Sequence, residues 1–90
     1  MNKILKEITI DMYNSDLDYI FIKRGNYSVK RTSTNIYHYY FGNCICLVNL
    51  MTKQFNLYDC GYTKFRLTTA QLNFLEQFYK NKGYILNYKE

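Results

Sequence analysis

The sequence predicts an α+β fold: an antiparallel sheet meander of about four to five strands with one C-terminal α-helix packed across it. Three observations favour it. Short runs rich in Tyr, Ile, Phe and Val alternate in polarity, Gly and Asn separate these runs, and an amphipathic stretch follows them. At 90 residues we expect a single domain over 1–90. Its core depends on few large side chains, and 11 Tyr and 6 Phe can supply them.

The N-terminal segment "KILKEITIDMY" has two interpretations. Ile4, Leu5 and Ile8 have helical spacing, whereas Ile8, Ile10 and Met12 alternate as in a strand. A short helix and a strand are therefore both open here.

The middle of the chain predicts strands joined by tight turns. "YIFIKRGNYSVKRTS" contains two strand-forming runs around Gly25-Asn26, a hairpin signal. "NIYHYYF" is a further strand, with three rings expected on one face: Tyr37, Tyr39 and Phe41. Gly42-Asn43 indicates either a hairpin turn or a bulge, and "CICLVNL" and "QFNLYDC" predict another hairpin.

The clearest helix signal is "TTAQLNFLEQFYKNKG". Thr68 and Gln71 have the spacing of a capping box, and Gly83 suits the left-handed position after a helix. Between them runs an apolar stripe with helical spacing: Leu72, Leu75, Phe78 and Tyr79. "YILNYK" then predicts a last short strand.

The charge distribution points to an anionic partner. The chain carries a net charge of +5. The segment from Tyr19 to Arg66 contains seven Lys and Arg residues but only one acidic residue, Asp59. In "KRGNYSVKR" and "GYTKFR" the cations alternate with rings, as in single-stranded nucleic-acid sites and in protein-binding hot spots. A tyrosine-rich sheet that needs solubilising charges would look the same. The candidate surface is Lys23, Arg24, Tyr27, Lys30, Arg31, Tyr62, Lys64 and Arg66.

The histidine and the cysteines do not match a metal or catalytic motif. Cys44 and Cys46 are expected on one face of a strand near His38, but their spacing is not that of a zinc site. We expect reduced thiols, no metal, no cofactor and no catalytic residues. Because no signal peptide and no apolar run of about 20 residues is visible, we expect a cytoplasmic protein without a membrane partner.

The segment "FGNCICLVNLMTKQFNLYDCGYTKFRLTTAQLN" resembles a type of small phage and mobile-element protein. Those proteins share a hairpin with a Leu-rich second arm, a Gly-aromatic pair, Thr residues, and a helix opening with a hydrophobic-Asn pair. The features correspond to Leu57, Gly61-Tyr62, Thr68-Thr69 and Leu72-Asn73. The resemblance implies a hairpin-plus-helix module in a viral setting, where proteins of this size include anti-CRISPR and other anti-defence inhibitors.

Together these observations predict a non-enzymatic binding protein. The leading hypothesis is a phage-type inhibitor of a host defence complex, with a host protein or nucleoprotein as partner in the host cytoplasm. The alternative is a single-stranded nucleic-acid-binding module that uses the same basic, tyrosine-rich surface. A small hydrolase or nuclease lacks visible catalytic residues, and a homodimer is compatible with the sequence.

Overall fold

The computed structural model describes residues 3–16, 19–58 and 69–89, which form two helices and six strands. In chain order the elements are α1 (Lys3–Tyr13), β1 (Ile20–Arg24), β2 (Tyr27–Arg31), β3 (Asn35–Tyr40), β4 (Asn43–Asn49), β5 (Gln54–Leu57), α2 (Thr69–Asn81) and β6 (Ile85–Lys89).

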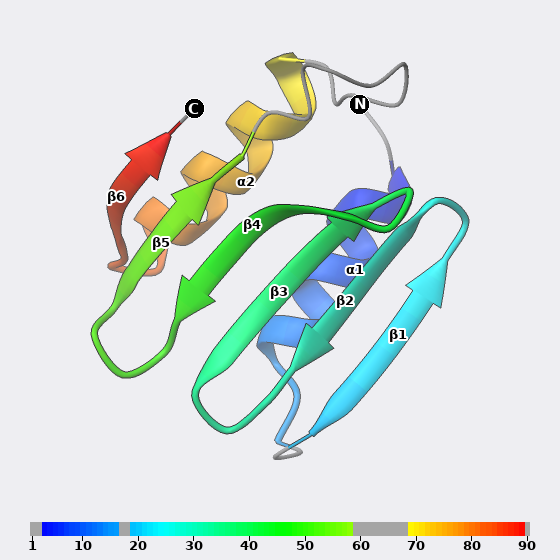
Figure 1. Cartoon of the computed structure of the whole chain (residues 1–90), viewed down its shortest axis with the longest axis horizontal. Coiled ribbons are helices and arrows are strands. Elements are labelled where there is room, and N and C mark those ends of the chain that lie inside the picture. The colour runs from blue at the N-terminus through cyan, green and yellow to red at the C-terminus, as the bar shows by residue number, and fades with distance from the viewer. Residues whose placement is uncertain (1–2, 17–18, 59–68, 90) are drawn as a thin grey trace.

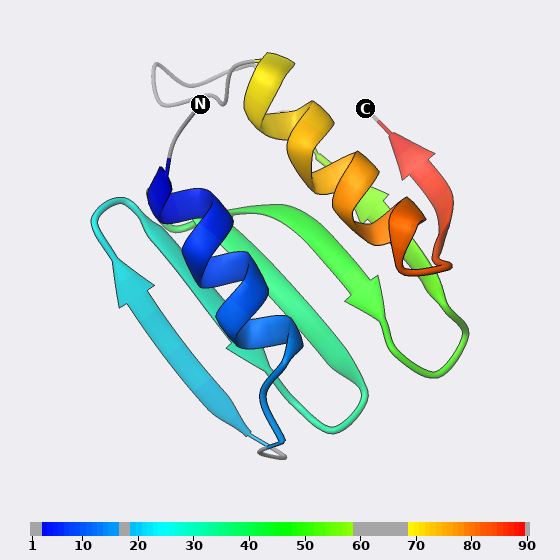
Figure 2. The ribbon, with the colours of Figure 1, turned by 180° about the vertical axis from the view of Figure 1, so that it is seen from behind.

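The six strands form one sheet in the order β1-β2-β3-β4-β5-β6. Neighbouring strands are antiparallel except β5 and β6, which run parallel. Figure 1 shows the sheet in front of both helices, and Figure 2 shows the two helices side by side on the same face. The described elements therefore form two layers, and neither of their helices lies over the other face of the sheet.

The α+β class is confirmed, but two details of the prediction are wrong. The sheet has six strands and is mixed, because α2 carries the chain from β5 back to a parallel neighbour. The N-terminal segment adds a second helix, α1, so the C-terminal helix does not cover the sheet alone. Leu5, Ile8 and Met12 are all buried, which settles the ambiguous segment in favour of helical spacing.

Two hairpins have two-residue turns. At Gly25-Asn26 only the glycine has positive φ (60°), which is the pattern of a type II′ turn. At Phe41-Gly42 both residues have positive φ (50° and 79°), as a type I′ turn requires. The second site is a hairpin, but its turn lies one residue before the predicted Gly42-Asn43, so Phe41 is a turn residue and does not share a strand face with Tyr37 and Tyr39. A bulge lies nearby, because the β3–β4 register shifts between His38 and Tyr39.

The core lies between the sheet and the two helices and is centred on Tyr79 of α2, which is fully buried. Its ring contacts five others, contributed by α1, the sheet, α2 itself and the residue before β6: Tyr13, His38, Phe55, Phe78 and Tyr84. Leu75 is also fully buried, and the rest of the predicted stripe packs at the margin of the core. The predicted helix and its apolar face are confirmed.

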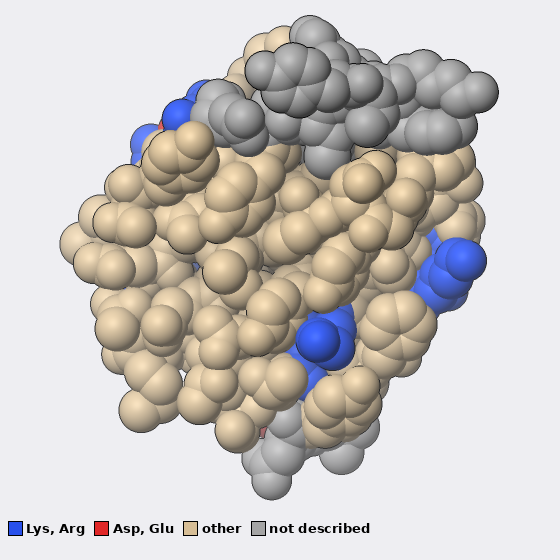
Figure 3. All heavy atoms as spheres, in the orientation of Figure 1, with Lys and Arg blue, Asp and Glu red and all other residues tan. Residues whose placement is uncertain are grey.

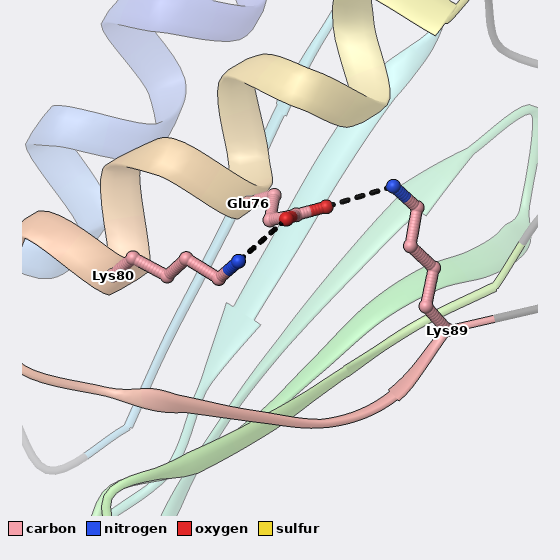
Figure 4. A network of polar contacts seen from close by, with 3 residues as sticks. All are labelled: Glu76, Lys80 and Lys89. Atoms are coloured by element: carbon pink, nitrogen blue, oxygen red, sulfur yellow. Dashed lines mark hydrogen bonds and ion pairs between the residues drawn. The ribbon is translucent and has the colours of Figure 1, made fainter.

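A charged cluster joins β6 to α2 (Figure 4). Both carboxylate oxygens of Glu76 are paired, Oε2 with Lys80 Nζ at 2.7 Å and Oε1 with Lys89 Nζ at 2.8 Å. Hydrogen bonds from Lys80 and Lys89 lower the pKa of Glu76. Lys80 and Lys89 are therefore paired within the protein.

The burial of α2 can be tested at Leu75. Replacing Leu75 with Ala leaves a cavity between helix and sheet, so we expect a loss of about 2–5 kcal/mol in the free energy of unfolding, measured by urea denaturation. Ile85→Ala, at a side chain 66% exposed, is the control and should change stability little. A loss below about 1 kcal/mol for Leu75→Ala would contradict the packing of α2.

Candidate functional site

The candidate site is the sheet face opposite α1 and α2, called the open face from here on. Strand alternation and the register assign these side chains to it: Phe21, Lys23, Ser28, Lys30, Tyr37, Tyr39, Leu47 and Asn56. The residues between them on the strands, such as Val29, Ile36 and Val48, are buried under the helices.

Rings and cations are neighbours across the strands of the open face. The register aligns Phe21 of β1 with Lys30 of β2, and Lys30 with Tyr37 of β3. A second row aligns Lys23 with Ser28, and Ser28 with Tyr39. Adjacent strands are about 4.8 Å apart, so each row brings its side chains within reach of one ligand.

Lys30 forms a cation–π contact on this face. Its Nζ lies 4.5 Å from the centroid of the Tyr37 ring. Phe21, on the other side of Lys30, is 54% exposed although it is a large apolar side chain. An exposed ring, a cation and a second ring thus follow one another from β1 to β3.

The open face carries positive and no negative charge over the described strands. The carboxylates of the described residues lie on the helices or in the loop after α1: Glu7, Asp11, Asp16 and Glu76. Figure 3 looks onto the open face and shows blue Lys and Arg atoms over its β1–β3 half. This charge arrangement favours an anionic ligand.

Of the residues predicted from the sequence, Lys23 and Lys30 lie on the open face, whereas three others point to the helix-covered side. The Arg24 guanidinium pairs with Asp11 of α1 at 2.8 Å. Tyr27 is 3% exposed, and its hydroxyl accepts a hydrogen bond from Gln71 of α2. These residues join the helices to the sheet.

Arg31 stabilises the C-terminal end of α1. Its Nη1 donates to the carbonyl oxygens of Met12 (3.0 Å) and Tyr13 (2.6 Å). The last carbonyls of a helix lack intrahelical partners and carry partial negative charge, so a guanidinium there has a structural role. Tyr62, Lys64 and Arg66 lie outside the described residues, as do Cys60 and the proposed cap residue Thr68.

The sequence-based list omitted the rings that the fold places beside the lysines. Phe21, Tyr37 and Tyr39 share the open face with Lys23 and Lys30. The signal was present in the strand alternation, which had already placed Tyr37 and Tyr39 on one face. What was missing was the strand register that aligns Phe21 and Tyr37 with Lys30.

His38 is a core residue. It is 1% exposed, and its Nε2 is hydrogen-bonded to the Tyr79 hydroxyl at 2.5 Å, while Nδ1 has no partner in the described part of the chain. Burial lowers its pKa from the ordinary 6.5 to about 3, so the ring is neutral at pH 7. Cys46, its cross-strand neighbour, is buried, and burial raises the pKa of its thiol.

The bulge separates the two cysteines of β4. Cys46 pairs with His38 on the helix side, whereas Cys44 pairs with Tyr39 on the open face, with buried Ile45 between them. The prediction that the two thiols share a face is therefore wrong, because the extra residue shifts the alternation. Within residues 3–16, 19–58 and 69–89 no three His, Cys, Asp or Glu side chains are grouped to hold a metal ion. Neither α1 nor α2 has the length and apolar character to cross a membrane.

Arg31 and Arg24 give a matched test of structural roles. Arg31→Met removes two charge-assisted hydrogen bonds in a partly buried position, so we expect a loss of about 1–3 kcal/mol in urea denaturation. Arg24→Met removes an ion pair whose partners are 41% and 50% exposed, so its loss should stay below about 1 kcal/mol. Equal losses for the two variants would contradict the capping role of Arg31.

His38 makes stability depend on pH. The unfolded chain takes up a proton near pH 6.5 and the folded chain only near pH 3, so the free energy of unfolding falls as the pH drops between these values. From pH 7 to pH 5 we expect His38 to lower it by about 2 kcal/mol. The facing groups, Tyr79 of α2 and Cys46 of β4, stay neutral there because burial raises their pKa values.

The measurement compares denaturation of the parent protein and His38→Gln at both pH values. The Gln variant keeps an amide that can bond to the Tyr79 hydroxyl but has no group that titrates in this range. The parent should lose more stability than the variant. An equal loss in both would show that His38 is already accessible to protons in the folded state.

The geometry thus leaves one candidate functional surface in the described residues, the open face with its lysines and rings. His38, Tyr27 and Arg31 belong to the packing beneath it. No protein-family model, no curated protein and no solved structure matches this chain.

Proposed function

We propose that this protein is a non-catalytic binding protein whose open face binds single-stranded nucleic acid. The observation that carries the proposal is the alignment of Phe21, Lys30 and Tyr37 across three strands, on a face whose described strands carry no carboxylate. Single-stranded sites combine rings for stacking with cations for the backbone, and both are neighbours here.

The chemistry of each side chain suits this role. An unpaired base has an apolar π-face that stacks on an exposed phenyl or phenol ring, and Phe21 is 54% exposed. Lys23 and Lys30 stand beside these rings and supply charge for the adjacent phosphates. Stacking accepts any base, so we expect little sequence preference.

Rings and lysines follow one another over three strands of the open face, which suits an extended strand better than a small substrate. Catalysis by a general acid or base requires a titrating group near the substrate, and His38 lies buried on the other side of the sheet. Binding alone is therefore the role proposed for this face.

Inhibition of a host defence complex is the second candidate, and its motive is the sequence resemblance to phage accessory proteins. A nucleoprotein complex that contains single-stranded nucleic acid would offer the open face the same chemistry as a free strand. Action in the host cytoplasm and formation of a homodimer belong to this candidate and are measured separately, by localisation and by light scattering.

The salt dependence of binding tests the leading proposal. In fluorescence anisotropy with a labelled single-stranded oligonucleotide, the logarithm of affinity should fall with the logarithm of salt concentration by about 0.7 per phosphate contact. Replacing Lys23 and Lys30 together with Gln removes two contacts, so we expect weaker binding and a slope reduced by about 1.4.

The control is the double change Lys3→Gln and Lys6→Gln on the exposed surface of α1, which removes the same charge from the helix layer. Its salt slope should remain near that of the parent. Equal effects of the two double variants would show that only net charge matters and would contradict a site on the open face. Capture of a protein after nuclease treatment, with no oligonucleotide affinity, would favour the inhibitor.

A further inference from the structure

A pocket opens at the end of the open face where two hairpin turns meet. Its volume is about 440 Å³, within the range of roughly 300–1,000 Å³ typical of small-ligand sites. It is lined by Phe21, Lys23, Gly25, Asn26, Ser28, Phe41 and Gly42. A hydrogen bond of 2.9 Å from the Phe41 amide to the Asn26 carbonyl holds the two turns together.

Phe41 has an unusual backbone for its side chain. Its φ of 50° lies in the left-handed region, which is unfavourable for a bulky residue, and type I′ turns generally have Asn-Gly where this one has Phe-Gly. Its ring is 40% exposed and lines the pocket. The strained conformation therefore displays an aromatic ring at the surface, and such strain is concentrated at functional sites.

The other non-glycine residue with positive φ in the described part of the chain is different. Lys53, at 59°, accepts a hydrogen bond from the Ile85 amide and places its Nζ 4.9 Å from the Tyr84 ring centroid. The left-handed conformation of Lys53 is thus found together with two contacts that attach β6 and the residue before it to the turn. The Phe41 ring lies edge-on to the Tyr40 ring, with the centroids 4.7 Å apart, and its other side lines the open pocket.

The lining has the parts that a nucleotide needs. Phe21 and Phe41 supply two exposed rings for a base, and Lys23 supplies a cation for its phosphate. The Ser28 hydroxyl and the Asn26 amide add uncharged hydrogen-bonding groups, and no carboxylate lines the pocket. An acidic ligand with an aromatic ring fits this chemistry, and the lysine rows of the open face continue from it.

We propose that this pocket holds one nucleotide of the bound single strand, with its base on the Phe41 and Phe21 rings and a phosphate at Lys23. This proposal rests on the proposed function, and it assigns the strongest contact between the protein and the single strand to the pocket. The strand would continue from the pocket across Lys30 and Tyr37, which share the open face.

The decisive variant is Phe41→Asn, which removes the ring and creates the favoured Asn-Gly turn. Binding of a labelled single strand should weaken roughly 5- to 150-fold, as loss of one stacked base does. Thermal unfolding should shift upward, by roughly 4–8 °C, because Asn tolerates the left-handed region. If Phe41 had only a structural role, Phe41→Asn would lower both the affinity for the single strand and the midpoint of thermal unfolding.

Two further variants complete the experiment. Phe41→Tyr keeps a ring and should retain parental affinity, and Phe21→Ser tests the second ring if Phe41→Asn does not fold. A strand with 2-aminopurine in place of one adenine reports stacking directly, and its fluorescence should be quenched by the parent but not by Phe41→Asn.

The outcomes separate this proposal from the one on which it rests. Parental affinity in Phe41→Asn and Phe21→Ser, with the loss confined to Lys23→Gln plus Lys30→Gln, would overturn the pocket and leave nucleic-acid binding by the open face intact. A parent protein that binds no single strand at low salt would overturn both. Weak binding with unquenched 2-aminopurine would also overturn the stacked base.

Discussion

The burial of the Tyr79 side chain is the constraint on which the rest of the structure depends. Its ring contacts rings from α1, β3, β5 and the residue before β6, and its hydroxyl is hydrogen-bonded to His38. A small domain buries a limited fraction of its surface, so one large side chain in contact with every layer supplies much of its core. The hydroxyl requires a buried partner, which explains why a histidine lies inside the sheet.

This packing places both helices on one face of the sheet and leaves the other open. Arg24, Tyr27 and Arg31 then act as links between sheet and helices, through Asp11, Gln71 and the end of α1 respectively. Three of the five cations and rings predicted in "KRGNYSVKR" are thereby used for folding. The lysines on the alternate positions, Lys23 and Lys30, keep their charge at the surface, which is why the binding proposals concentrate on them.

The turns divide between structural and surface roles. Gly25 and Gly42 allow tight hairpins, and the hairpins fix the register that aligns rings with lysines on the open face. Phe41 occupies a left-handed position that type I′ turns usually fill with Asn, and its ring packs against Tyr40. The pocket proposal therefore predicts that stability and ligand binding oppose each other at Phe41.

The sequence by itself determined the α+β class, the hairpin at Gly25-Asn26, the hairpin between β4 and β5, and the apolar stripe of α2, because each depends on periodicity or turn residues within a short window. Only the tertiary structure decided that α1 is a helix, that β6 runs parallel to β5, and that a bulge separates Cys44 from Cys46. It also decided which cations of "KRGNYSVKR" bond to the helix layer and which lie on the open face. The reason is physical: Lys and Arg alternate along a strand by the same rule as any residue, and the face they occupy depends on where the helices pack.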